Sequence, residues 1–386
     1  MKAVVCRNKI LEVVERPEPQ PGRGQVLVKI LRCGICGSDL HVREHCDEWG
    51  AIMARSGYTA LTSSDQEVIF GHEFSAEILD YGVGSKRSLK VGTHVVAMPA
   101  LRRGDNVDLI GLAEHTTGAY AERMLVEESL MMPVPNGLSP DLAALTEPMA
   151  VGWHALNRGE VKKRDVAVVI GCGPVGLAII SLLKARGVQK IIAADLSEGR
   201  RRLATECGAH IVVNPSDESP YAQFGDAAFV KDAPQLLGLL MDTSEKLRKL
   251  PLPWWYTWRA IEKLLGNPKA PVVFECVGAK GVLQSIIEGV PHFTRIVVVG
   301  VCMQSDKMEH AVAINKQVDL RYAVGYSPLE FRDTLHLMSE GKVDCAPIIT
   351  GKVGLDGVNA AFKVLSDPAR HAKILIDPAS VGAQIY

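Results

Sequence analysis

Three short segments carry side chains of the types that bind transition metals. The sequence CGSDLH begins at Cys36, GHEF contains His72 and Glu73, and Glu147 directly precedes a proline. Thiolate, imidazole and carboxylate are ligands of Zn²⁺, and a catalytic zinc takes three protein ligands and keeps one position open. Taken singly, Cys36 could be a buried apolar thiol, His72 a core histidine and Glu147 a surface acid. Together, these residue types indicate a zinc site.

Other possible ligands in the sequence are interpreted as structural. Cys33 forms a C-x-x-C pattern with Cys36, but the sequence has no second such pair to complete a four-cysteine site. We therefore predict that Cys33 is a core residue of a strand. His45 and Cys46 lie in a polar stretch and are not predicted to be ligands. His154 is predicted to pack against its neighbours.

A glycine-rich segment has the pattern that binds a dinucleotide. Gly171, Gly173 and Gly176 form G-x-G-x-x-G between the apolar run VAVVIG and an apolar helix-like run. The first glycine permits a tight turn, the second lets a pyrophosphate approach the backbone, and the third lets the helix pack on the strand. An acid, Asp195, ends the next strand, close to the expected distance of about 20 residues. A glycine turn in another α/β protein is the alternative, and the strand–helix context favours the dinucleotide.

The acid at the end of the second strand also predicts which dinucleotide binds. Asp195 would accept a hydrogen bond from the ribose 2′-hydroxyl and repel a 2′-phosphate, which favours NAD over NADP. Arg200 could lie on the other side of the ribose, or it could be one charge of a solvated RRR run. The sequence leaves both interpretations of Arg200 open.

The elements around these motifs divide the chain into two kinds of structure. Short strand-like runs bounded by Gly and Pro fill the first part, and from about residue 165 strands alternate with helices. That alternation predicts βαβ units and a doubly wound parallel sheet. Two amphipathic helices and a last strand, AKILID, follow Tyr326. The segment Val42–Phe70 is polar and predicted to be irregular, and Pro215–Ala270 is longer than a usual connection between sheet strands.

Composition excludes several classes of protein. The 386 residues carry a formal net charge of −1, which argues against a general nucleic-acid binder and gives no reason to expect a patch for anionic membranes. Nine scattered cysteines favour a reducing compartment, and no signal peptide is expected, so we predict a cytoplasmic protein. The uncharged run Val166–Leu183 contains glycines and a proline, so a strand, a turn and a helix explain it better than a membrane span.

The motifs together resemble the zinc-dependent medium-chain dehydrogenases, of the alcohol, sorbitol and threonine dehydrogenase kind. GICGSDLH, GHEFSAEI, GAYAE, LTEPMAVGWHAL, GCGPVGL, ADLSEGR, FECVGA and VVVGV occur in the order of that family over nearly the whole chain. The resemblance implies an α/β fold with a GroES-like β-rich catalytic domain at 1–152 and a Rossmann NAD-binding domain at 153–324. An insert at about 217–268 would interrupt the second domain, and residues 325–386 would return to the first.

The resemblance also assigns roles around the metal. Cys36, His72 and Glu147 would bind the catalytic zinc, and Glu73 would be a neighbouring ligand that can exchange. Asp39 would orient His72, because a metal-bound imidazole needs a partner on its other nitrogen. Many relatives carry four closely spaced cysteines for a structural zinc, and this chain has none between residues 96 and 118. We therefore expect one zinc per subunit.

The implied reaction is hydride transfer between an alcohol, most simply a secondary one, and NAD, in either direction. The alcohol proton would leave through Ser38, the cofactor ribose and His41. The insert between Cys36 and His72 is longer than usual for the family and should lie over the substrate cleft, so the resemblance does not identify the substrate. Besides the three glycines, the cofactor-binding residues that it implies are Pro174, Val175, Asp195, Arg200, Val277, Val299 and Val301.

Two other functions stay open at this point. A zinc-free quinone or enoyl reductase could share the fold, although it would have no use for Cys36, His72 and Glu147 together. A dinucleotide-binding protein without enzymatic activity is the second alternative, and the intact relay residues speak against it. No nucleic-acid partner or membrane span is expected. The family's use of the cofactor domain for subunit contacts implies a homodimer or homotetramer.

A cluster of aromatic residues is not explained by these assignments. The sequence PLPWWYTW, from Pro251 to Trp258, holds three of the chain's five tryptophans and lies in the long insert. Such a cluster could bind a partner or anchor the protein at a membrane interface. Because tryptophan is amphipathic and common at interfaces, packing on its own domain or at a subunit interface is the favoured interpretation.

Overall fold

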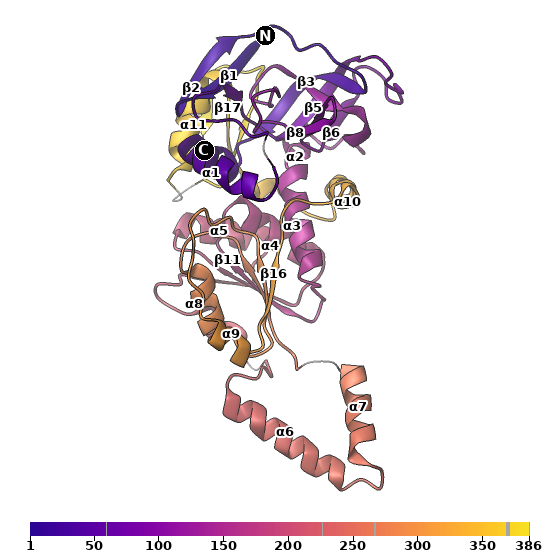
Figure 1. The fold of residues 1–386 in the computed structure, drawn as a ribbon, viewed down its shortest axis with the longest axis vertical. Coiled ribbons are helices and arrows are strands. Elements are labelled where there is room, and N and C mark those ends of the chain that lie inside the picture. Colours follow the sequence, from indigo (N-terminus) through magenta and orange to yellow (C-terminus); the bar gives the residue numbers. More distant parts are fainter. Residues whose placement is uncertain (59, 226, 266–267, 368–370, 386) are drawn as a thin grey trace.

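The molecule is elongated, with three parts in a row. The computed structural model describes residues 1–58, 60–225, 227–265, 268–367 and 371–385. A β-rich domain lies at one end, a parallel-sheet domain in the middle and a helical arm at the other end (Figure 1). Within the described residues, no helix has the length and apolar composition needed to cross a membrane. The uncharged run at 166–183 forms a strand, a turn and a helix, as predicted.

The middle domain is a doubly wound sheet of six parallel strands in the order β13–β12–β11–β14–β15–β16. Its central strands are continuous Val, Ile and Ala runs because helices cover both faces, α4 and α5 one face and α8 and α9 the other. The order is that of a Rossmann fold, which confirms the predicted fold class. The elements are β11 (Val166–Ile170), α4 (Pro174–Ala185), β12 (Lys190–Ala194), α5 (Glu198–Cys207), β13 (Ile211–Val213), β14 (Val272–Glu275), α8 (Val282–Gly289), β15 (Arg295–Val298), α9 (His310–Asn315) and β16 (Asp319–Tyr322).

The β-rich domain is built from both ends of the chain. Its central strand β3 pairs with β5 and β9 from the first part and with β18 from the last part. Its strands are β1 (Lys2–Arg7), β2 (Ile10–Glu15), β3 (Gln25–Gly34), β4 (Val68–Ile69), β5 (Glu73–Tyr81), β6 (His94–Ala97), β7 (Ala100–Arg103), β8 (Asn106–Leu109), β9 (Arg123–Glu127), β10 (Met131–Pro133), β17 (Ile349–Val353), β18 (Lys373–Ile376) and β19 (Ala383–Ile385). Helices α2 (Pro140–Ala143) and α11 (Val358–Leu365) complete it.

Two helices join the domains. Helix α3 (Thr146–Arg158) runs from the β-rich domain into the Rossmann domain, and α10 (Pro328–Ser339) packs beside it. His154 Nδ1 on α3 lies 3.0 Å from Glu330 Oε2 on α10, so His154 has the packing role that we predicted. Helix α3 passes through residue 152 without a break, so it belongs to both domains. The predicted domain boundaries at 152 and 324 stay predictions.

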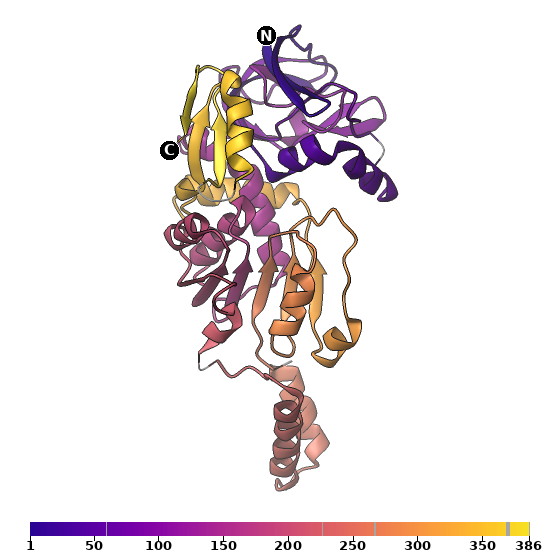
Figure 2. The ribbon, with the colours of Figure 1, turned by 90° about the vertical axis from the view of Figure 1, so that its left-hand side faces the viewer.

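The prediction of irregular structure at Val42–Phe70 is wrong for its first half. Helix α1 spans Gly37–Arg55, with one non-helical residue, His45, inside it. Val42, Cys46 and Trp49 repeat at helical spacing and pack on the core of the β-rich domain, which is the signal that composition concealed. Figures 1 and 2 show α1 on the side of that domain that faces the Rossmann domain.

The second insert forms the arm. After β13, Phe224 and Phe229 pack on the parallel sheet, and the chain then leaves the domain as α6 (Ala233–Arg248) and α7 (Trp254–Leu265) (Figure 2). The Trp254 ring contacts the rings of Trp255 and Trp258 edge to face, and the Arg248 guanidinium lies 5.1 Å from its centroid. The aromatic cluster therefore packs within the arm and not on the parallel sheet, and the other favoured interpretation, a subunit interface, stays a prediction.

Candidate active site

Strand pairing brings three of the predicted metal ligands together. Strands β3 and β5 are antiparallel with Gly34 opposite Glu73, so the end of β3 meets the beginning of β5. Cys36 follows β3 as the N-cap of α1, and His72 directly precedes β5. One ligand atom each from Cys36, His72 and Glu73 lie within 4.8 Å of one another.

A buried aspartate fixes the geometry of two of these residues. The Cys36 backbone amide and the Tyr120 hydroxyl donate hydrogen bonds to Asp39 Oδ2, at 3.0 and 2.8 Å. Asp39 Oδ1 lies 3.4 Å from His72 Nδ1, and His72 Nε2 lies 3.3 Å from Ser38 Oγ. Burial opposes the charged form of His72, but the charges of Asp39 and Cys36 outweigh it and raise the pKa of His72. This geometry supports the orienting role predicted for Asp39.

A buried lysine that the sequence analysis did not identify binds one of the clustered residues. Lys373, the first residue of β18, donates from Nζ to both oxygens of Glu73, at 2.7 and 2.6 Å, and to the Ile35 carbonyl at 2.9 Å. Both side chains of the pair are buried. Burial opposes the charge of Lys373, and the carboxylate of Glu73 overcomes this effect and raises the pKa of the lysine. No local pattern links two residues 300 positions apart.

The fourth predicted ligand lies beside the cluster and is not part of it. Glu147 is in the first turn of α3 and accepts a hydrogen bond from the Tyr326 hydroxyl. Burial raises the pKa of Glu147 to about 7, and the nearby charge of His72 acts in the opposite direction. Tyr326, which stacks on Phe331, is a further residue that the sequence analysis did not assign to the site.

The donor set fits a zinc ion. A tetrahedral zinc with bonds of about 2.0–2.3 Å holds its ligands about 3.3–3.8 Å apart, so the three clustered donors need only small shifts to bind one. Cys36 stands at a helix N-terminus, where the helix dipole favours a negatively charged metal ligand. Asp39 Oδ1 is 3.4 Å from His72 Nδ1, and neither atom has a hydrogen-bond partner among the described residues, so a small shift would make Asp39 the partner that a zinc-bound histidine requires.

The glycine loop has the shape that a pyrophosphate needs. Gly171 has a φ of +93°, a conformation that favours glycine. A Cβ on Gly176 would lie 1.9 Å from the Gly171 carbonyl oxygen, so only glycine lets α4 pack this closely. A Cβ on Gly173 would meet nothing within 4 Å, and Gly173 is the N-cap of α4. The open space at this helix N-terminus is therefore available to phosphate, and Pro174 and Val175 form the first turn behind it.

Asp195 is held at the end of β12 beside this loop. Its carboxylate accepts hydrogen bonds from the amides of Cys172 at 2.7 Å and Ser197 at 2.8 Å. Arg201 donates to the Asp195 carbonyl at 2.8 Å, whereas Nε of Arg200 is buried without a hydrogen-bond partner among the described residues. The structure thus places Asp195 beside the glycine loop, and a contact of Asp195 or Arg200 with the cofactor ribose stays a prediction.

The remaining predicted cofactor residues lie at the carboxyl ends of the next two strands. Val277 follows β14 and Val301 follows β15; both side chains are exposed, and Val299 is partly buried. Leu196, next to Asp195, is exposed at the same edge and was not predicted. In open parallel sheets this edge is where ligands bind, so uncovered apolar side chains there fit a bound nucleotide.

Comparison with known proteins identifies the family of the chain. The family model "Alcohol dehydrogenase GroES-like domain" matches residues 22–136, and "Zinc-binding dehydrogenase" matches 174–340. The chain is 30% identical to (R,R)-butanediol dehydrogenase of Bacillus subtilis, over 98% of this chain and all of that one. L-threonine 3-dehydrogenase of Streptomyces coelicolor is 26% identical over 98% and 99% of the two chains. The crystal structure of 2R,3R-butanediol dehydrogenase from Bacillus subtilis matches with a TM-score of 0.74 at 28% identity, over 98% and 99%.

The chain belongs to the zinc-dependent medium-chain dehydrogenase family. It is an oxidoreductase of the NAD-dependent alcohol dehydrogenase type, with zinc and NAD as cofactors. The predicted enzyme class is thereby confirmed, and neither the zinc-free reductase nor the non-enzymatic alternative is retained.

The buried pair of Lys373 and Glu73 predicts a strong coupling in stability. Lys373→Met should lower the free energy of unfolding by about 3–5 kcal/mol, because it leaves the Glu73 carboxylate buried and unpaired. Urea unfolding of the metal-free protein measures the effect. Adding Glu73→Gln to Lys373→Met should restore part of the loss, since the double variant buries no charge at this position. Strictly additive losses would show that the pair is not coupled.

The position of Asp195 predicts a preference for NAD over NADP. Two like charges about 4 Å apart at an effective dielectric constant of about 20 repel by about 4 kcal/mol, an upper limit of roughly a thousandfold. Asp195→Asn keeps an oxygen for the Cys172 amide and removes the charge, so it should improve kcat/KM for NADP at least about tenfold. The control is Glu198→Gln, which changes an exposed acid in the next helix. It should change kcat/KM neither for NADP nor for NAD. A wild-type enzyme that uses NADP as well as NAD would contradict this role of Asp195.

Proposed function

We propose that the enzyme oxidises a small secondary alcohol with a hydroxyl or amino group on the neighbouring carbon. The relatives named for (R,R)-butanediol and for carbon 3 of L-threonine support this class. A butanediol with two R centres is the 2,3-diol, and carbon 3 of threonine is a secondary carbinol beside an amine. The single observation that carries the proposal is the cluster of Cys36, His72 and Glu73 donors, with the Ser38 hydroxyl 3.3 Å from His72.

The metal would be held by Cys36 and His72 together with a carboxylate. We propose Glu147 as the third ligand and Glu73 as the ligand that exchanges. Glu73 is already neutralised by Lys373, whereas Glu147 is bonded to the neutral hydroxyl of Tyr326. A buried carboxylate without a cationic partner is costly, so Glu147 gains more from a cation. When bound, zinc acidifies an alcohol and the nicotinamide accepts its hydride.

The proton of the alcohol would be handled by Ser38 and His41. Ser38 stands in the first turn of α1, next to His72, and can accept the proton at Oγ. His41 is one helical turn further along α1, and its side chain is partly covered and partly exposed, so it can pass the proton to water. Burial, with a smaller contribution from His45, lowers the pKa of His41, so its ring is neutral and able to accept a proton at neutral pH.

We also infer a cytoplasmic homodimer or homotetramer. Nine free cysteines support a reducing compartment. The edge strand β16 and the residues after it expose Tyr322 and Val324. An exposed apolar edge of this kind is suited to pairing with a second copy. Light scattering would give the mass of the assembly.

Zinc content and substrate preference test the proposed function together. The purified protein should hold one zinc per chain, and Cys36→Ala should lose zinc and alcohol oxidation while NADH binding survives. Glu147→Gln should release zinc to a chelator more readily than Glu73→Gln does. With NAD, kcat/KM for (2R,3R)-butanediol or L-threonine should exceed that for 2-butanol by about 10–100-fold, the value of one or two hydrogen bonds.

The proposal fails if 2-butanol is used as well as both polar substrates, or if full oxidation of alcohols persists without zinc. A zinc-loaded enzyme that oxidises neither polar substrate would reject the substrate class alone. Wild-type zinc affinity in Glu147→Gln would reject the proposed ligand set without affecting the substrate class.

The relay predicts a pH-dependent defect. His41→Gln should slow alcohol oxidation by about 10–100-fold near pH 6 and much less near pH 9, where hydroxide can take the proton. Zinc and NADH affinity should stay unchanged, because His41 contacts neither in the proposed arrangement. His45→Gln, four residues along the same helix, is the control. If both variants have the same pH profile, His41 has no role in the relay.

A further inference from the structure

The arm ends in a surface that the dehydrogenase reaction does not use. Helices α6 and α7 project from the Rossmann domain on the side opposite the β-rich domain, and the turn between them is the far end of the molecule (Figures 1 and 2). We call residues 246–259 the tip. Both helices are too short and too polar to cross a membrane. The tip could therefore contact a membrane at its surface, and neither of its helices could span one.

The tip is strongly basic in a chain that is almost neutral. It contains Lys246, Arg248, Lys249 and Arg259 and no acidic residue, whereas the whole chain has a net charge of −1. All four basic residues are exposed. Like charges at the tips of two copies would repel, so a symmetric contact between two tips is disfavoured. The charge fits an anionic surface instead.

Apolar and aromatic side chains stand exposed among these charges. Leu252 and Tyr256 are each 63% exposed, Trp255 is 47% exposed and Leu250 is 46% exposed. Tryptophan and tyrosine favour the region of lipid head groups because one end of each ring system is apolar and the other is polar. Basic residues together with Trp and Leu are the composition of segments that lie on membranes.

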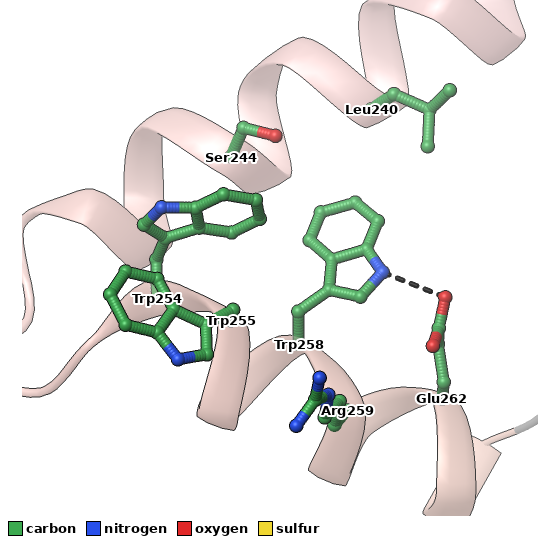
Figure 3. A pocket seen from close by; sticks show the side chains of 7 residues that line it. All are labelled: Leu240, Ser244, Trp254, Trp255, Trp258, Arg259 and Glu262. Atoms are coloured by element: carbon green, nitrogen blue, oxygen red, sulfur yellow. Dashed lines mark hydrogen bonds between the residues drawn. The ribbon is translucent and has the colours of Figure 1, made fainter.

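A hollow between the two helices adds to this surface. It has a volume of about 490 Å³, and its walls include three tryptophan rings, with Arg259 as the cation among them (Figure 3). Trp258 Nε1 donates to Glu262 Oε1 at 2.8 Å, which leaves its ring face towards the hollow. The side chains that line it are Leu240, Ser244, Trp254, Trp255, Trp258, Arg259 and Glu262. The hollow is mainly apolar and carries one cation, Arg259, and one acid, Glu262, so its apolar walls can receive the hydrocarbon part of a phospholipid.

We propose that the tip of the arm docks on the surface of a membrane that contains anionic phospholipids. The basic residues would contact lipid phosphates and carboxylates, and Leu252, Trp255 and Tyr256 would enter the head-group layer. The arm leaves the sheet at the end where β14 begins, whereas the glycine loop follows the end of β11. Docking therefore leaves the cofactor edge and the metal site free to work.

Vesicle binding by the full-length protein tests the proposal. The wild type should sediment with vesicles of phosphatidylcholine containing about 30% phosphatidylserine, and at least about tenfold less with phosphatidylcholine alone. About 0.5 M NaCl should abolish most of the binding seen at about 0.05 M, because salt screens the charges. Tryptophan emission should shift to shorter wavelength on binding, since three of the five tryptophans lie at the tip.

Two variants of the tip separate the contributions. Lys246→Gln with Arg248→Gln and Lys249→Gln should weaken binding roughly 100-fold, at about fivefold per basic residue. Leu252→Ser with Trp255→Ser should also lose binding, with little change in its salt dependence.

The control removes the same charge elsewhere: Lys162, Lys163 and Arg164, all exposed in the loop before β11, are changed to glutamine. It should bind vesicles as the wild type does. All variants should keep wild-type NADH binding and dehydrogenase activity, which shows that they are folded.

Three results would overturn the proposal. The first is wild-type protein that binds anionic vesicles no better than neutral ones. The second is equal loss of binding in the control and the tip variant, which would make the effect one of overall charge. The third is a tip variant that binds vesicles normally but has a smaller mass in light scattering, which would assign the tip to contacts between copies of this chain.

Discussion

The main constraint on this structure is that several acidic side chains are buried close together at the metal site. Cys36, Asp39 and Glu73 lie together where β3 ends and β5 begins, with Glu147 of α3 beside them, and burial is the largest cause that raises the pKa of Asp39 and of Glu147. Such charges are tolerated inside a protein only with partners. Lys373 provides one of these partners, and it arrives on a strand from the last part of the chain. The return of the chain to its first domain thus brings Glu73 its cation, and a metal bound by the other acidic groups would balance their charge in the same way.

Those parts of the site that sequence could predict are the ones encoded locally. The glycine loop, the acid at Asp195 and the C-G-S-D-L-H segment each lie within a few residues of the strand or helix that positions them. The parts that it missed depend on tertiary contacts. Lys373 is paired with a residue 300 positions away, and Tyr326 reaches Glu147 from the segment after β16. No spacing rule contains this information, because the pairing of β18 with β3 creates it.

The two inserts show a different limit of sequence reasoning. At 42–55 the polar composition hid a helix whose residues packed on the core, Val42, Cys46 and Trp49, are widely spaced in the sequence. At 233–265 the chain could be recognised as an insert, but its position could not, because a helical hairpin can fold back on its domain or leave it with the same local pattern. The structure shows that the hairpin leaves its domain, because the large side chains of Leu252 and Tyr256 are exposed.

The direction in which the arm leaves the sheet follows from the topology of a parallel sheet. All strands run the same way, so cofactor loops gather at one edge and the connections that enter the strands gather at the other. An insert directly before β14 must therefore emerge on the side away from Gly171 and Asp195. Such an insert can acquire tryptophan and basic residues without disturbing the chemistry, because it enters the sheet at the end opposite the cofactor loops. The almost neutral net charge of the chain does not reveal this surface. Acidic residues elsewhere cancel the charge of the four basic residues of the tip in the total, but none of them lies within the tip.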